Sequence, residues 1–363
     1  MGSTWGNSIK ISIFGESHGG GIGVVLDGFP SGIAYDEAFI LSEMKRRAPG
    51  QNKQSTARKE SDAPRVLSGI LNGKTTGTPI CAVIENTNQR SGDYAELADQ
   101  PRPGHADYTG MLRYKGFNDP RGGGHFSGRL TAPLVFAGAL CKLYLKSEGV
   151  MVGSHIQSIA QIQDMPFDDV CVTEEQLEGL RTAEYPIQND RVRDAMLTAI
   201  EDARLEQDSV GGVIECAAIG LPAGLGSPMM DTVESRLSSI LFAVPAVKGV
   251  EFGAGFGFAG LRGSHANDTF YKENGTVKTD TNNNGGVLGG ITSGMPVLVR
   301  AAIKPTPSIA MQQQTLSLSR GTVEPLSIHG RHDPCIVTRA APVIEAAVAI
   351  AVADLLREAK GYA

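Results

Sequence analysis

Two alanine-rich stretches, "RLTAPLVFAGALCKLYL" (residues 129–145) and "PVIEAAVAIAVADLL" (residues 342–356), carry most of the information about the fold. Each is apolar around nearly its whole circumference when it is written as a helix, and helices of that kind are buried on most faces. A buried helix needs other elements packed on both sides. The two stretches therefore predict central helices inside the core.

The rest of the chain predicts sheets that cover those helices. Strands and helices do not alternate as regular βαβ units, so we expect one α+β domain over residues 1–363. The expected strands are "IKISIFG" (9–15), "GVVLDGF" (23–29), "PICAVIEN" (79–86), "GGVIECAAIGLP" (211–222) and "MPVLVRAAI" (295–303). Amphipathic helices are expected at 36–47, capped by Asp36, and at 190–207 and 232–242. The glycine-rich segments 19–23, 50–63, 101–128, 253–263, 284–294 and 304–334 are expected to be mostly loops.

Composition argues against several classes of protein. The net charge of −6 over 363 residues does not favour general nucleic-acid binding. The five cysteines lie far apart with no C-x-x-C pair, so a reducing compartment fits best. The first ten residues hold no apolar signal core, and no apolar run reaches the roughly 18 residues of a membrane span. We expect a cytoplasmic protein that does not bind membranes.

The segment "IFGESHGGGIGVV" (residues 13–25) contains a literal G-x-S-x-G pattern, which can mark the nucleophilic serine of a hydrolase. Such a serine stands where a strand turns sharply into a helix. Ser17 is instead followed by glycines up to Gly23 and then by a second strand-like run, which also argues against a dinucleotide-binding loop. A glycine hairpin with an incidental Ser–His pair is one interpretation. The other is that His18 performs acid–base chemistry near neutral pH.

Cations gather in three further places. Seven Lys or Arg against two acidic residues lie between Lys45 and Arg65, as either a solvated basic loop or an anion site. "RPGHADYTG" (102–110) adds Arg102 and His105. In "DPRGGGHFSGRLTA" (119–132) glycines precede a helix whose N-terminus suits phosphate, although a plainly capped helix start explains the same residues.

Turn-rich segments complete the candidate chemistry. They are "NNNGGVLGGITSG" (282–294), "KPTPSI" (304–309) and "GRHDPCIVTRA" (330–340). By residue type His18, His105 and Asp333 suit a metal ion, but no H-E-x-x-H or similar spacing supports such a site.

Taken together, these segments resemble the chorismate synthase family from about Trp5 to Leu356, with no large insertion. Any single motif is a weak signal, but six in register argue against chance. The motifs are GESHG (15–19), RPGHADY (102–108), GGGHFSGRLTA (122–132), GGVLGGITSGMP (285–296), KPTPSI (304–309) and GRHDPC (330–335).

The resemblance implies an activity. The family converts 5-enolpyruvylshikimate 3-phosphate to chorismate and inorganic phosphate by an anti-1,4 elimination, and it requires reduced FMN without net redox change. Its fold sandwiches helices between antiparallel sheets and assembles as a homotetramer. The reduced FMN would come from a separate flavin reductase or, as in some relatives, from NADPH used by the chain itself.

The resemblance also assigns roles to residues. His18 would protonate the departing phosphate, and His105 would protonate or stabilise the reduced flavin near N1 and O2. Asp333 would lie near flavin N5 and, with Ser17 as a polar relay and not a nucleophile, help N5 take the C6 hydrogen. The substrate-side cations are Arg47, Lys53, Arg102 and Arg129. The flavin-contacting positions are His125, Phe126, Ser127, Ala246, Gly289, Lys304, Pro305, Thr306, Pro307, Ser308 and Arg331.

One departure from the family pattern affects the flavin-phosphate contact. Many members have Arg and Ser where this chain has His125 and Phe126, and a Glu in place of Leu130. A histidine donates hydrogen bonds to an anion, but its charge near pH 7 depends on its surroundings.

Two other functions stay open on the sequence. One is a different flavin-dependent lyase acting on a shikimate-like acid. The other is a non-catalytic flavin- or anion-binding protein, which has no need for both histidines together with Asp333. The hydrolase interpretation would require Ser17 to react with a serine-directed phosphonate.

Overall fold

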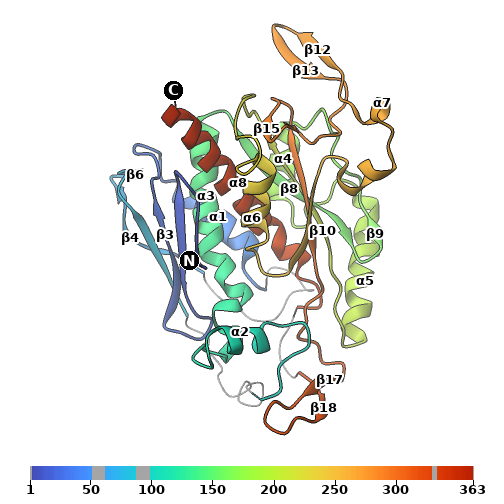
Figure 1. Ribbon diagram of the computed structural model, residues 1–363. Coiled ribbons are helices and arrows are strands. Elements are labelled where there is room, and N and C mark those ends of the chain that lie inside the picture. The colour runs from blue at the N-terminus through green and yellow to red at the C-terminus, as the bar shows by residue number, and fades with distance from the viewer. Residues whose placement is uncertain (1, 51–61, 87–98, 329–332, 363) are drawn as a thin grey trace.

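The two alanine-rich stretches form α3 (Thr131–Ser147) and α8 (Val337–Tyr362), which pack against each other in the middle of the molecule (Figure 1). This computed structural model describes residues 2–50, 62–86, 99–328 and 333–362. The helices approach closely at Gly138, where a Cβ atom would lie 2.3 Å from the Cβ of Ala346. Small side chains thus allow the contact between the two helices.

Two five-stranded sheets enclose this helical layer, and every strand pair in the described ranges is antiparallel. The first sheet has the order β1 (Thr4–Trp5), β2 (Lys10–Gly15), β3 (Gly21–Asp27), β7 (Ile80–Glu85), β4 (Arg65–Ser68). The second has the order β11 (Val247–Phe252), β16 (Val297–Ile303), β10 (Gly212–Ile219), β8 (Met151–Ile159), β9 (Ile162–Gln163).

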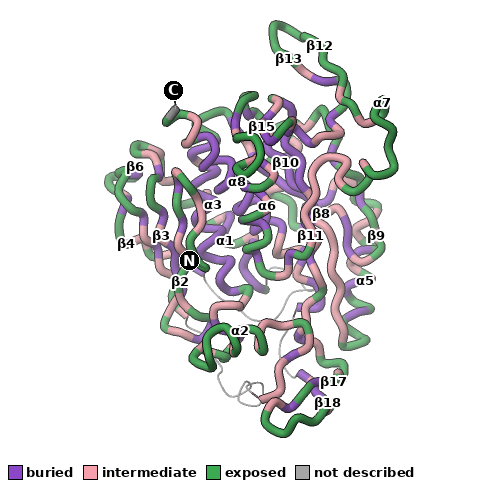
Figure 2. Tube along the Cα trace, viewed as in Figure 1, coloured by how far each residue is buried: buried purple, intermediate pink, exposed green. Residues whose placement is uncertain are grey.

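The helices lie in layers relative to these sheets. α3 contacts the first sheet and α8 the second, while α1 (Glu37–Arg47) and α6 (Val233–Leu241) pack beside them. α4 (Glu174–Thr182) and α5 (Arg193–Leu205) pack against β8 of the second sheet. Figure 2 shows buried residues concentrated along α3 and α8. The predicted α+β sandwich of central helices between antiparallel sheets is confirmed.

Most expected elements are present where the sequence places them. Asp36 caps α1, and its Oδ1 accepts a hydrogen bond from the backbone N of Phe39 at 2.9 Å. The segments 284–294 and 304–334 are mostly loops among the described residues, as expected, but each also holds a short hairpin. These hairpins are β14 (Val287–Leu288) with β15 (Ile291–Thr292), and β17 (Gln313–Leu316) with β18 (Val323–Leu326).

Smaller elements decorate this frame. They are α2 (Asp107–Arg113), α7 (Gly263–Ala266), the hairpins β5 (Ile70–Leu71) with β6 (Lys74–Thr75) and β12 (Phe270–Glu273) with β13 (Thr276–Thr279), and the 3₁₀ turns η3 (Arg121–Phe126), η4 (Gly128–Leu130), η5 (Asp190–Val192) and η6 (Gly255–Gly260). No helix among the described residues is long and apolar enough to cross a membrane.

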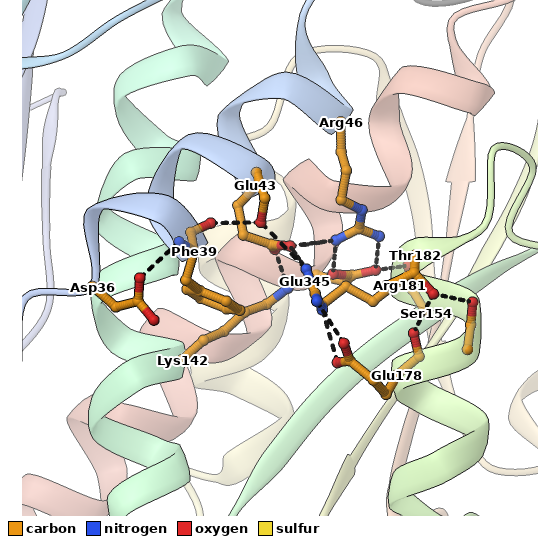
Figure 3. Close-up of polar contacts among 12 residues, drawn as sticks. Asp36, Phe39, Glu43, Arg46, Lys142, Ser154, Glu178, Arg181, Thr182 and Glu345 are labelled. Atoms are coloured by element: carbon orange, nitrogen blue, oxygen red, sulfur yellow. Dashed lines mark hydrogen bonds and ion pairs between the residues drawn. The ribbon is translucent and has the colours of Figure 1, made fainter.

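A buried cluster of charges joins α1, α3 and α8 (Figure 3). The two carboxylate oxygens of Glu345 accept hydrogen bonds from Arg46, each at 2.7 Å. Lys142 contacts Glu43 at 2.5 Å and also pairs with Glu345. The two cations balance the two carboxylates, so each buried charge has an opposite partner. Because α1 is fixed in this way, the side chain of its last residue, Arg47, is held at a defined place.

Candidate active site

A cavity of about 1240 Å³ opens beside the N-terminal half of α3 and the start of α8. It is lined by most of the residues that the sequence motifs nominate, although they come from distant parts of the chain. These are Ser17, His18, Arg47, Arg102, His105, His125, Phe126, Ser127, Arg129, Ala246, Lys304, Thr306, Pro307, Ser308 and Asp333.

Four nominated residues are not placed in this cavity by the structure. Gly289 lies in the turn between β14 and β15, and neither it nor Pro305 lines the cavity. Lys53 and Arg331 fall outside the described residues. Among the described residues, no three His, Cys, Asp or Glu side chains gather as a metal site.

Ser17 and His18 lie in the turn between β2 and β3, so the motif is a hairpin and not a strand-to-helix elbow. Both side chains are buried, at 2% and 4% exposure. Asn86 fixes the turn, because its Nδ2 donates to the carbonyl oxygens of Glu16 and Gly19 at 3.0 Å each. The geometry expected of a hydrolase nucleophile is therefore absent from this segment.

The triple glycine of η3 packs directly against both histidines. Gly122, Gly123 and Gly124 all have positive φ angles, of 60°, 82° and 54°. A Cβ atom on Gly122 would lie 2.6 Å from Cε1 of His18, and one on Gly123 would lie 3.4 Å from Nε2 of His105. The carbonyl of Gly124 also accepts a hydrogen bond from the backbone N of Ser17 at 3.1 Å. Only glycine permits both this backbone conformation and this close approach.

His105 is oriented by a carboxylate and an arginine. Its Nδ1 lies 2.6 Å from Oδ1 of Asp107, and Arg102 donates to both oxygens of the same carboxylate. Burial alone would raise the pKa of Asp107, but hydrogen bonds from Arg102 and His105 lower it far below its usual range. Because the carboxylate accepts the Nδ1 proton, the other ring nitrogen, Nε2, is the one left for chemistry at the glycine loop.

Two arginines of the cavity wall share one buried carboxylate. Arg47 pairs with Oδ2 of Asp62 at 2.7 Å, and Arg129 pairs with Oδ1. Arg129 Nε also donates to the side chain of Asn86 at 3.1 Å. Both guanidinium groups line the cavity, where they suit an anionic ligand.

Asp333 lines the same cavity as Arg47. Its carboxylate pairs with Nη1 of Arg339, a residue in the first turn of α8. Arg339 Nε donates to the backbone carbonyl of Arg47 at 3.1 Å. The RHDP motif, α8 and the end of α1 are therefore joined by one side chain.

His125 has both ring nitrogens within hydrogen-bonding distance of the chain itself. Nδ1 lies 2.8 Å from the carbonyl of Gly15 and donates to it, and Nε2 lies 2.9 Å from the hydroxyl of Ser3. The side chain therefore ties the N-terminal segment to the end of β2. In this arrangement it offers no spare nitrogen to a flavin phosphate.

The KPTPSI segment adds a cation and a hydroxyl. The backbone N of Lys304 donates to Ala246 at 2.9 Å, and Arg102 Nη1 donates to the hydroxyl of Ser308 at 3.1 Å. Burial, with the charge of Lys248, lowers the pKa of Lys304. This side of the cavity also presents positive charge.

Three residues at the site were not nominated by motif. Asp62 was counted only as a negative charge within a basic stretch, and neither Asn86 nor Arg339 stood out in the sequence. The one available signal for Arg339 was its place just before the alanine-rich stretch 342–356.

The fold and the site define a class of protein: an α+β helix-and-sheet sandwich with a large, cation-lined cavity that carries three histidines. The chorismate synthase family model matches residues 9–356. The chain belongs to the chorismate synthase family.

Individual relatives agree with this membership. The chorismate synthase of Thermococcus kodakarensis is 46% identical over 357 residues, which is 98% of each chain. That of Dehalococcoides mccartyi is 44% identical over 98% of this chain and 96% of its own. A solved crystal structure of chorismate synthase aligns with a TM-score of 0.77 at 29% identity, covering 98% of this chain and 94% of that one.

Proposed function

We propose that the protein is a lyase that converts 5-enolpyruvylshikimate 3-phosphate to chorismate and inorganic phosphate and requires reduced FMN. The observation that carries the proposal is the meeting of His18, His105 and Asp333 at one cation-lined cavity in a member of this family. The three residues come from motifs more than 80 positions apart, and a merely anion-binding protein has no need to bring them together.

The residues present fit both ligands. A single drug-sized ligand occupies about 300–1,000 Å³, whereas this cavity measures about 1240 Å³. Lys304 and Ser308 would hold the flavin side, and Arg47, Arg102 and Arg129 the substrate anions. The flavin, when bound and reduced, supplies an electron-rich ring beside the substrate.

The chain's own groups meet the needs of the elimination. The C3–O bond breaks and its electron pair leaves with phosphate. The electron pair of the C6–H bond stays in the ring as a new double bond while the existing double bond shifts toward C3, so the hydrogen leaves as a proton to a base. Guanidinium groups neutralise the phosphate, and a proton from His18 makes it a better leaving group. His105 holds a proton at Nδ1 toward Asp107 and keeps Nε2 in the cavity. Asp333 supplies a carboxylate at the cavity wall.

The decisive experiment mixes the protein with 5-enolpyruvylshikimate 3-phosphate and photoreduced FMN without oxygen. Chorismate absorbance and phosphate release are followed together. We expect equal amounts of both products, and none with oxidised FMN. If FMN binds but neither product forms, the proposed reaction is wrong while the flavin site stands.

Substitution of either histidine tests the assigned roles. We expect His18→Ala and His105→Ala each to lower turnover by on the order of 10²-fold or more, because positioned acid–base groups are worth about 10²–10⁴-fold. Circular dichroism should show that both variants are folded. Wild-type turnover in both would refute the assignment.

The oligomeric state, the source of reduced FMN and the cellular location are proposed on the basis of the same family membership. We infer a cytoplasmic homotetramer that receives reduced FMN from a separate reductase. Light scattering would give the mass of the assembly. NADPH oxidation by the purified protein in the presence of FMN would show that the chain reduces flavin itself and would contradict the external supply.

A further inference from the structure

Arg339 lines the cavity and contacts both Asp333 and the backbone at the end of α1. Its Nη1 pairs with Oδ2 of Asp333, and its Nε donates to the carbonyl of Arg47 at 3.1 Å. Its side chain is 20% exposed and that of Asp333 is 7% exposed. The pair is therefore more than a solvated surface contact, which would be worth little.

The geometry fixes the direction of the guanidinium. The group is planar, with donors at fixed angles, so a hydrogen bond from Nε to a backbone carbonyl determines where Nη1 points. That carbonyl belongs to Arg47, at the end of α1, and α1 is itself fixed by the ion pairs of Arg46 with Glu345. Through Arg339, Asp333 is therefore connected to α1, which the buried ion pairs hold in the core.

Because Asp333 is buried, its ion pair with Arg339 also stabilises its negative charge. A carboxylate taken out of water is costly unless a cation or hydrogen-bond donors compensate it. The guanidinium of Arg339 favours the ionised form of Asp333 and favours one orientation of it. A lysine in its place would keep the charge but lose the fork that fixes the direction.

We propose that Arg339 is a positioning residue that holds Asp333 as an oriented carboxylate at the cavity wall. The proposal rests on the proposed function, in which Asp333 acts near the hydrogen that leaves C6. It assigns Arg339 no direct contact with substrate or flavin. Its effect on the reaction therefore passes through Asp333.

The first test uses the protein without flavin. Arg339→Met leaves the carboxylate of Asp333 without this cation, so the urea midpoint of unfolding should fall. Adding Asp333→Asn should restore part of the loss, because the negative charge that Arg339 had stabilised is then removed as well. Arg204→Met, which breaks an exposed pair with Glu201 on α5, is the matched control and should leave the midpoint unchanged. Additive effects of Arg339→Met and Asp333→Asn would overturn the proposal.

The second test uses turnover with reduced FMN. Arg339→Met should lower kcat on the order of 10- to 100-fold with little change in KM, as expected from a misplaced reacting group. Arg339→Lys should recover part of that loss. The double variant with Asp333→Asn should be no slower than Asp333→Asn alone. A raised KM at unchanged kcat would show direct substrate binding and would overturn the proposal.

The two tests separate this proposal from the proposed function. If the wild-type protein makes no chorismate, the reaction is wrong, yet the unfolding cycle still decides whether Arg339 holds Asp333. If the wild-type protein is active but the effects of the two residues are independent, only the positioning role fails.

Discussion

At the residue scale, the candidate site depends on the absence of a side chain at Gly122. The missing Cβ leaves room for the ring of His18, whose Nδ1 would otherwise lie 2.7 Å away, and for the hydroxyl of Ser17 at 3.0 Å. Real Cβ atoms do not approach ring or hydroxyl atoms so closely, so something must move. The side chains that would move are the ones to which the proposed function assigns chemistry.

We therefore predict that Gly122→Ala lowers turnover by up to about 100-fold, since small displacements of a reacting group cost that much. Gly116→Ala is the control, because Gly116 also has a positive φ, of 78°, but a Cβ there meets no atom within 4 Å. Both variants carry the backbone cost of about 1–3 kcal/mol for a left-handed residue, and urea unfolding measures it. Equal turnover in the two variants would contradict the role of the gap at Gly122.

At the scale of elements, the crossing of α3 and α8 sets how the two sheets are spaced. Gly138 faces Ala346 there, and a Cβ on Gly138 would lie 2.4 Å from the Cα of Ala346. Two effects compete when Gly138 becomes Ala. Helix propensity favours Ala by about 1 kcal/mol, but overpacking a close contact costs about 1–3 kcal/mol.

We expect overpacking to prevail, because the new Cβ would clash with the backbone of Ala346. That backbone belongs to the buried helix α8, which can shift only together with the elements packed around it. Gly138→Ala should lower the free energy of unfolding by up to about 2 kcal/mol. Gly179→Ala, at an exposed position of α4 where a Cβ meets nothing within 4 Å, should raise it by about 0.5–1 kcal/mol. Denaturant unfolding measures both, and a stabilised Gly138→Ala protein would count against the close helix crossing.

At the scale of the whole molecule, stability depends on the buried charges that join α1, α3 and α8. Burial by itself would raise the pKa of Glu345, but Arg46 and Lys142 lower it well below the ordinary value of 4.5. A carboxyl whose folded-state pKa is depressed stabilises the fold fully above its unfolded-state pKa. That contribution is lost as the pH falls below about 4.5 toward the depressed folded-state pKa.

Glu345→Gln should be less stable than the wild-type protein by about 3–5 kcal/mol at pH 7, because it leaves buried cations with one carboxylate fewer. The difference should shrink as the pH falls from 5 toward 3, since this carboxyl is then protonated in the unfolded wild-type chain but still ionised in the folded one, which favours unfolding. Urea unfolding across that pH range gives both quantities. A difference that stays constant with pH would argue against a depressed pKa at Glu345.

The sequence predicts local features well and long-range contacts poorly. Asp36 caps α1 as expected because capping depends on residues only three apart. The motifs pointed to His18, His105 and Asp333. No pattern indicated that Asp62 lies between Arg47 and Arg129, because Asp62 and Arg129 are 67 residues apart in the sequence. Asn86 was missed for the same reason, since its partners Glu16 and Arg129 lie on opposite sides of it in the chain.

By itself, the sequence determined the buried helices, the strands β2, β3, β7, β10 and β16, the glycine hairpin at GESHG and, through its motifs, the family. It did not predict β8 or β11 of the second sheet. These depend on periodicity and on residue types at fixed short spacings, which are properties of a local stretch. Only the tertiary structure decided that His125 is bonded to Ser3 and Gly15, and that Arg339 joins Asp333 to Arg47. The physical reason is that hydrogen bonds and ion pairs act over a few ångströms in space. Which side chains come that close is set by how the sheets and helices pack.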